Sequence, residues 1–170
     1  HFNTQLSDKL STGLYIHANN RSQKFDRNND SFLDMPLANQ INIMNRWQYV
    51  NLQKGLISFL NVRYLNDEKQ AGQLSFDPKT DRLSTSVWGS EIDTKRFEIS
   101  GKFGYVNPDI PYRSLGIQVA YSAHDQDSYF GTNQYDINHK SMYSNMVYNT
   151  IISDSRHKIK TGLNATYDRY

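Results

Sequence analysis

The stretch Lys95–Tyr105, KRFEISGKFGY, carries the clearest pattern in this chain. Successive side chains of a β-strand point to opposite faces, so residues that alternate in polarity predict a strand with one apolar and one polar face. Here the apolar set is Phe97, Ile99, Gly101, Phe103 and Tyr105, and the polar set is Arg96, Glu98, Ser100, Lys102 and Gly104. One face therefore favours lipid or a protein core, and the other favours water.

The same alternation recurs in the residues that follow. Leu115, Ile117, Val119, Tyr121 and Ala123 form the apolar set of the next strand, and Ile159, Thr161, Leu163, Ala165 and Tyr167 form that of the last. Between them, residues 139–152 predict a strand in which both faces carry apolar residues. The stretch 95–168 therefore predicts four consecutive strands.

The connections between the predicted strands alternate in length. The preceding strands are expected at 2–6, 10–18, 46–52 and 56–65, the short turns at 7–9, 53–55, 107–112 and 153–156, and the long polar loops at 19–45, 66–94 and 125–138. In an up-and-down meander every second connection lies at the same end. The sequence therefore predicts an all-β antiparallel meander with every long loop at one end, an arrangement typical of outer-membrane barrels and not of soluble sandwiches.

Composition narrows the class of protein further. The 170 residues suggest one domain, and the absence of cysteine excludes disulfides and thiolate metal sites. A net charge of +2 gives no argument for nucleic acid as a partner. No apolar run reaches the roughly 18 residues of a transmembrane helix. The mean hydropathy of −0.75 is still compatible with a membrane barrel, because half of each barrel strand faces a polar interior.

Aromatic residues gather near the ends of the predicted strands. Trp47, Tyr49, Tyr105 and Tyr112 lie near the turn end, and Tyr64, Phe97 and Tyr121 lie nearer the loop end. Two such rows match the aromatic girdles that flank the lipid-facing band of a transmembrane barrel. A single ring fits a soluble core equally well, so only the whole set supports the membrane interpretation.

Several stretches resemble the barrel of a TonB-dependent outer-membrane receptor, of the type annotated in Bacteroidetes as siderophore or cobalamin receptors. They are Phe32–Leu37, Asn45–Tyr49, Asn61–Glu68, Gly104–Val106, Ser122–Gly131 and His157–Leu163. The resemblance spans almost the whole chain. It is specific for the family and uninformative about the substrate.

The resemblance implies a transmembrane β-barrel of about 22 strands that encloses an N-terminal plug. Residues 1–170 would form a central part of that barrel, and the plug, the TonB box and the C-terminal strands would lie outside it. The chain begins with His1 and shows no signal peptide, so we expect a piece of a longer, processed protein.

The family also implies a function without covalent chemistry. We expect TonB-driven uptake of a scarce nutrient chelate, siderophore-iron or cobalamin-like, across the outer membrane of a Gram-negative bacterium. The implied partners are the chelate, the TonB complex (through the missing N-terminal region) and outer-membrane lipid, with no nucleic acid. The long loops would form the recognition surface.

The segment Asp26–Asp34, DRNNDSFLD, is the sharpest local motif. Oxygen-bearing side chains at alternate positions suit a hard cation such as calcium. The predicted ligands are Asp26, Asn28, Asp30 and Asp34 with the carbonyl of Phe32. Ser31 stands where calcium loops usually have glycine, and no glutamate closes the loop. A solvated loop rich in Asp and Asn is the competing interpretation.

A second group of candidates lies where predicted strands meet the outer loops. His124, Asp125 and Asp127 would contact a substrate or a metal, and His139 would lie across the same hairpin. Arg63 and Arg96 belong to the polar face and would meet an anionic ligand. Hydration and cross-strand ion pairing explain the same charges without a ligand.

Two other classes of protein compete with the transporter. One is a soluble all-β ligand- or glycan-binding module, which would be monodisperse and would melt cooperatively without detergent. The other is a barrel enzyme, which needs a nucleophile–base pair near a loop end. No such pair can be assembled from the sequence, so we expect no enzyme.

Overall fold

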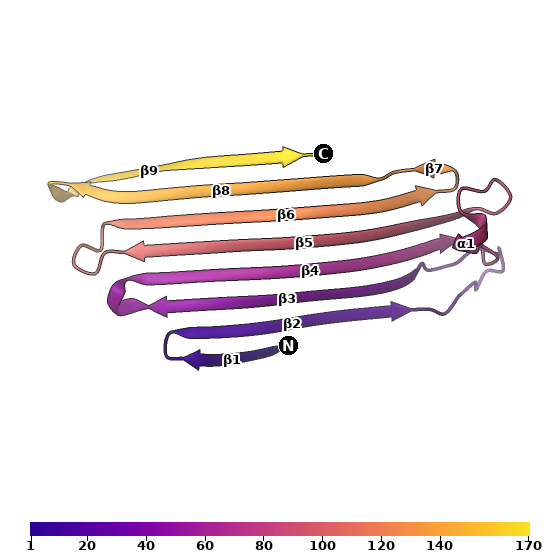
Figure 1. Cartoon of the computed structure of the whole chain (residues 1–170), viewed down its shortest axis with the longest axis horizontal. Helices are drawn as coiled ribbons and strands as arrows, with labels where there is room; N and C mark the ends of the chain where they lie inside the picture. Colours follow the sequence, from indigo (N-terminus) through magenta and orange to yellow (C-terminus); the bar gives the residue numbers. More distant parts are fainter.

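The computed structural model describes the backbone of residues 1–170 and every side chain except those of residues 154–155. The chain forms one antiparallel sheet of nine strands, which is open rather than closed (Figure 1). The strands are β1 (Phe2–Ser7), β2 (Leu10–Arg21), β3 (Leu37–Asn51), β4 (Leu56–Gly72), β5 (Gly89–Val106), β6 (Ser114–Phe130), β7 (Asn133–Gln134), β8 (Ile137–Ile152) and β9 (Asp154–Arg169). Two short helical segments accompany them, η1 (Leu52–Lys54) and α1 (Pro78–Asp81).

The strands pair in the order in which they occur in the chain. The sheet runs β1-β2-β3-β4-β5-β6-β8-β9, and the two-residue β7 pairs with β6. Figure 1 shows the connections β1–β2, β3–β4, β5–β6 and β8–β9 at one end of the sheet and the other three, with α1, at the opposite end. The predicted all-β up-and-down meander is therefore confirmed. The predicted sorting of loops by length is wrong in one place: β6 runs to Phe130 and β8 begins at Ile137, so the predicted loop 125–138 shrinks to residues 131–136 and is no longer than the turn at residues 107–113.

The strands are longer than predicted at the loop end. β3 begins at Leu37, inside the predicted loop 19–45, and the predicted loop 66–94 shrinks because β4 runs to Gly72 and β5 begins at Gly89. The extensions of β4 and β5 carry charged residues on the side of the apolar positions, with Glu68 paired opposite Asp93, so hydrophobic alternation gives little signal there. The extension of β3 does alternate, because Ile41 and Ile43 follow Gln40 and Asn42, and this signal was overlooked.

The strand register brings the apolar positions onto one face. Residues directly opposite each other in an antiparallel pair point to the same side. Phe97 lies opposite both Tyr64 and Ala123, and Ile99 lies opposite both Val62 and Tyr121. We call this surface the apolar belt. It comprises Leu14 and Ile16 of β2; Ile41, Ile43 and Trp47 of β3; Leu56, Leu60, Val62 and Tyr64 of β4; Phe97, Ile99, Phe103 and Tyr105 of β5; Leu115, Ile117, Val119 and Tyr121 of β6; Met142, Met146 and Tyr148 of β8; and Leu163 and Tyr167 of β9.

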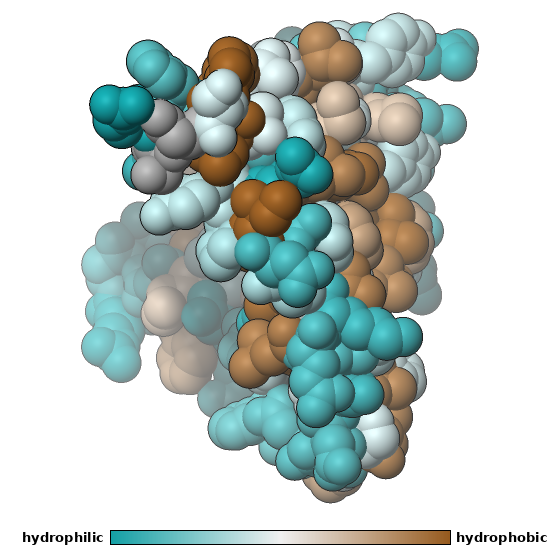
Figure 2. All heavy atoms as spheres, turned by 90° about the vertical axis from the view of Figure 1, so that its left-hand side faces the viewer, coloured by the Kyte–Doolittle hydropathy of each residue, from teal (hydrophilic) through white to brown (hydrophobic). Residues whose placement is uncertain are grey.

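No second layer covers the apolar belt in the part of the chain that the structure describes. Phe97 is 41% exposed, Val119 44% and Leu163 71%. Among the described residues only Phe76 and Tyr129 are buried aromatic or aliphatic side chains, and both lie at the loop end. Figure 2, seen from the turn end, shows hydrophobic residues gathered along one side of the sheet. Neither described helix is long and apolar enough to span a membrane.

The turn between β3 and β4 depends on one glycine. Gly55 has φ +64°, its N–H donates to the Leu52 carbonyl at 3.1 Å, and its own carbonyl accepts from the N–H of Val106 at 2.8 Å. A Cβ at this position would lie 1.7 Å from the Val106 carbonyl oxygen. The turn therefore needs a residue that has no side chain and that tolerates positive φ.

We predict that Gly55→Ala destabilises the protein by about 1–3 kcal/mol, because the substitution adds left-handed strain to a backbone clash. The urea midpoint, followed by tryptophan fluorescence, measures the loss. Gly116→Ala is the matched control, since its Cβ would meet nothing nearer than the Val147 carbonyl at 4.0 Å. Equal midpoints for the two variants would contradict this account of the turn.

Candidate functional site: the polar face and the loop end

The face opposite the apolar belt carries a network of ion pairs. Arg63 Nη1 lies 3.2 Å from Glu98 Oε2, and Arg96 Nη2 lies 2.6 Å from Glu98 Oε1. Arg63 Nε also donates to Asn42 Oδ1 at 3.0 Å. The predicted cationic residues Arg63 and Arg96 therefore share one carboxylate, which neutralises part of their charge and fixes their direction.

Two histidines extend this network toward the loop end. His124 is paired with Arg96 on one side and with His139 on the other, as the sequence predicted for the hairpin. His139 Nε2 lies 3.0 Å from Asp168 Oδ1, and its ring stacks on Tyr170 with centroids 4.5 Å apart. In the described structure, the buried Nδ1 of His124 has no hydrogen-bond partner. These residues place two histidines beside the Arg63–Glu98–Arg96 network on the polar face.

The predicted group of His124, Asp125 and Asp127 is divided between the two faces. Asp125 follows His124 directly and so points to the other side of β6, where it accepts from Asn138 Nδ2 at 3.3 Å. Asp127 shares that side and is paired with Asp93. The structure therefore brings His124 together with Arg96 but not with either aspartate.

A row of carboxylates crosses three strands beyond the apolar belt. Glu68, Asp93 and Asp127 are consecutive partners on β4, β5 and β6. Burial raises the pKa of Asp93, and the nearby charges of Glu91, Glu68 and Asp127 raise it further, against a lowering effect of Arg82. Sequence reasoning missed Glu91 and Asp93 because it placed them in a loop. Ile92 is the only apolar residue among Glu91, Asp93 and Thr94, so the local alternation was too short to predict a strand.

The connection between β4 and β5 folds over this row. The ring of Phe76 lies 6.5 Å from that of Tyr129, and the Arg82 guanidinium lies 5.0 Å above the Tyr129 ring. The Tyr129 hydroxyl donates to Glu91 Oε2 at 2.7 Å. Burial, then this hydrogen bond, raises the pKa of Tyr129, so the phenol stays neutral. The loop end thus has a small core of its own.

We predict that Asp93→Asn flattens the dependence of stability on pH. A raised native pKa means that the folded state binds the proton more tightly than the unfolded state. Stability therefore falls as pH rises above the ordinary Asp value of 3.8, until the native group has ionised. Urea midpoints between pH 4 and neutrality measure this fall. Asp109→Asn, in the exposed turn before β6, should retain it; an equal fall in both variants would contradict the prediction.

The predicted calcium loop is closed by its own hydrogen bonds. Asp26 accepts the backbone N–H of Asp30 at 3.2 Å and of Ser31 at 3.0 Å, and Asp34 accepts that of Arg27 at 2.9 Å. Ser31 has φ +69°, the left-handed conformation that glycine favours at this point of a calcium loop. The sequence signal thus corresponds to a defined turn.

Metal binding at this loop is not established by the geometry. Among the residues described, no group of three or more His, Cys, Asp or Glu side chains is arranged to hold a metal ion. The Asp26, Asn28, Asp30, Phe32 and Asp34 ligand set remains a prediction.

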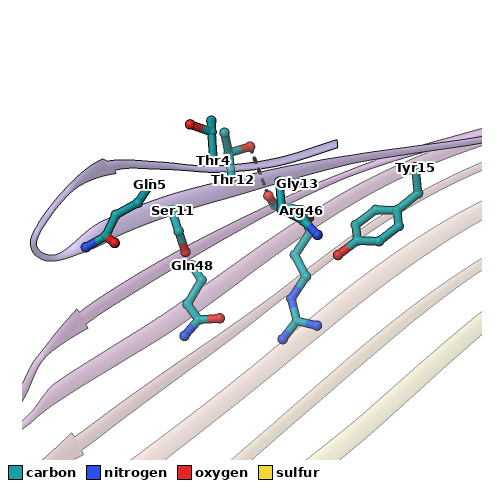
Figure 3. Close-up of a pocket in the computed structure, with 9 residues that line it drawn as sticks. Thr4, Gln5, Ser11, Thr12, Gly13, Tyr15, Arg46 and Gln48 are labelled. Carbon is teal, nitrogen blue, oxygen red and sulfur yellow. Dashed lines mark hydrogen bonds between the residues drawn. The ribbon is translucent and has the colours of Figure 1, made fainter. Parts of the chain in front are cut away.

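A hollow opens on the polar face across β1, β2 and β3 (Figure 3). Figure 3 shows Gln5, Ser11, Arg46 and Gln48 pointing to one side of the strands, and Thr4 and Thr12 to the other. Gly13 allows the Asn3 side chain to pack over its backbone, because a Cβ there would lie 2.2 Å from Asn3 Oδ1. Amide, hydroxyl and guanidinium groups make this lining suitable for water or a polar partner.

Comparisons with protein-family models, with curated proteins and with solved structures find no match to this chain. The family resemblance therefore stays a prediction from the sequence.

Proposed function

We propose that this sheet is part of the wall of an outer-membrane receptor that takes up a scarce nutrient chelate, siderophore-iron or cobalamin-like, by TonB-driven transport. The observation that supports the proposal most strongly is the apolar belt, which continues across the strands on one face while ion pairs occupy the other. Lipid would cover the belt, and the polar face would line a wet interior.

The dimensions of the apolar belt support this proposal. On β5 the apolar positions extend from Phe97 to Tyr105, which matches the roughly 9–11 residues of a tilted transmembrane strand. Aromatic rings mark both limits, with Tyr64 beside Phe97 at the loop end and Tyr105 at the turn end. Beyond the loop-end limit the strands continue with charged residues, as expected of segments in water.

In such a receptor this chain would form part of the barrel wall and part of the surface that recognises the ligand. The loop end, where the acidic row and the packed connections lie, would face the outside and meet the ligand first. The Arg63–Glu98–Arg96 network would face the interior. Transport would follow from displacement of a plug by the TonB complex, so no side chain here needs to form or break a covalent bond. Calcium at Asp26–Asp34 would brace one outer loop.

We predict that Val119→Arg destabilises the membrane-inserted protein by about 2–4 kcal/mol, the cost of a cation on a lipid-facing strand near the bilayer centre. Ala120→Arg is the matched control, because Ala120 lies on the polar face, in a hollow lined by Ser100, Ser122 and Tyr143. Folding into lipid vesicles, followed by heat-sensitive gel mobility, measures both. Equal losses of stability in the two variants would contradict the assignment of the two faces. Cooperative folding without detergent or lipid would favour a soluble module.

Transport itself is tested in the source organism. Deletion of the gene should abolish the energy-dependent uptake of either a ferric siderophore or cobalamin, each supplied with a radiolabelled metal. Restoring the gene should restore uptake, and dissipating the proton-motive force should abolish it again. Unchanged uptake of both labelled compounds in the deletion strain would refute the proposed substrates.

A further inference from the structure

Two cations lie side by side at the margin of the apolar belt nearest the loop end, and we call them the cationic pair: Lys140 of β8 and Arg169 of β9. They are register partners, and both are exposed. Met142 and Tyr167, two residues along each strand, are also partners and belong to the belt. Strand parity therefore puts the cationic pair on the belt face.

The cationic pair completes a row that is apolar on the preceding strands. Lys140 lies opposite Ala123, which lies opposite Phe97, and Phe97 in turn lies opposite Tyr64. This row is the loop-end limit of the belt. A membrane that covers the belt changes there from hydrocarbon to head groups, so the two positive charges stand at the height of lipid phosphates.

No carboxylate in the described part of the chain forms an ion pair with either cation. Asp168 precedes Arg169 but points to the polar face, where it lies 3.0 Å from His139 Nε2. Asp125, one row higher on the belt face, accepts a hydrogen bond from a neighbouring side-chain amide at 3.3 Å. It also lies opposite Lys95, so that row adds one charge of each sign. The cationic pair is therefore a local excess of positive charge.

The repulsion between the two cations indicates an anionic partner. Like charges that face each other directly across two strands destabilise the pairing. On the polar face this cost is avoided, because the two guanidinium groups of the Arg63–Glu98–Arg96 network share one carboxylate. An anion placed between Lys140 and Arg169 would remove the same cost on the belt face.

The surface beside the cationic pair shows what kind of anion fits. Met142 is 54% exposed, Tyr167 66% and Leu163 71%, all on the belt face of β8 and β9. An inorganic anion or an acidic peptide would leave this apolar surface uncovered. A lipid matches both parts, because its acyl chains cover apolar side chains while its phosphate meets the cations.

From these observations we infer that the cationic pair binds the phosphate of an anionic lipid, whose acyl chains lie along the belt on β8 and β9. The Arg169 guanidinium can donate two parallel N–H groups to phosphate oxygens, and Lys140 adds a compact positive charge. The inference rests on the proposed function, since it takes the belt to be covered by a membrane. It adds a preference at one position of the wall for an anionic head group over a zwitterionic one.

The test is native mass spectrometry of the whole purified protein in a neutral detergent, with equal amounts of dioleoyl phosphatidic acid and dioleoyl phosphatidylcholine. The unaltered protein should retain phosphatidic acid in preference. Lys140→Gln and Arg169→Gln should each weaken that retention about fivefold, the effect of removing one cation beside an anionic lipid. Lys160→Gln is the matched control and should leave retention unchanged, because Lys160 lies on β9 but on the polar face, opposite Asn149.

Equal retention of the two lipids would overturn the inference, as would equal losses in the Lys140 and Lys160 variants. Displacement of the lipid by excess inorganic phosphate would overturn it by making free phosphate the ligand. Tighter binding of a polyglutamate peptide would overturn it by making the partner an acidic protein.

Insertion of each variant into vesicles of pure phosphatidylcholine is measured in parallel, which also shows that the variants fold. A protein that inserts without preferring phosphatidic acid refutes this inference alone. A protein that prefers phosphatidic acid in detergent but does not insert refutes the membrane proposal and leaves the phosphate preference standing.

Discussion

The rest of the structure depends on a single-layer sheet that has to satisfy two different surroundings at once. Its backbone hydrogen bonds are made between neighbouring strands, but one layer cannot bury its own side chains, because burial needs a second layer packed against the first. The apolar belt therefore remains open, and the stability of the sheet has to come from whatever covers it. An apolar surface that runs across most of the strands is far larger than the patches soluble monomers leave exposed.

On the polar face, ion pairs hold several charged side chains close together. Arg63, Arg96 and Glu98 stand close together without a packed core around them, and pairing two guanidinium groups with one carboxylate limits their mutual repulsion. Because these side chains are partly exposed, the pairs contribute little to stability. Their main effect is on orientation, because each ion pair holds its two side chains toward one another on the polar face. The loop end differs again, since Phe76 and Tyr129 give it a small buried core.

The sequence predicted the parts of the fold in which polarity alternates. Phe97 to Tyr105 and Leu115 to Ala123 could be assigned to strands and to faces from the printed residues, because one side of each strand is apolar. The outer ends of β4 and β5 could not, since pairs such as Glu68 and Asp93 carry no hydrophobic signal. The start of β3 was missed although Ile41 and Ile43 alternate with polar residues. The prediction grouped His124 with Asp125 and Asp127 because it began a loop at Asp125; once β6 is seen to run to Phe130, strand parity separates His124 from the two aspartates. The packing of Phe76 and Arg82 on Tyr129 depends on a loop whose path no local pattern encodes.

The uninterrupted ladders from β2 to β6 have a consequence for how such a chain can vary. Their pairing shows no irregularity, whereas the two shifts in the sheet occur at Gln5/Ser7 and Ile151/Ile152, beside the short turns. Losing one residue of β5 before Phe97 would exchange the sides of every residue beyond it, so that Glu98 would lie on the side of the apolar belt and Phe97 on the polar face. Length changes are thus tolerable only in the outer connections or in steps of two, and descendants of this sequence should diverge in loop size long before they diverge in strand length.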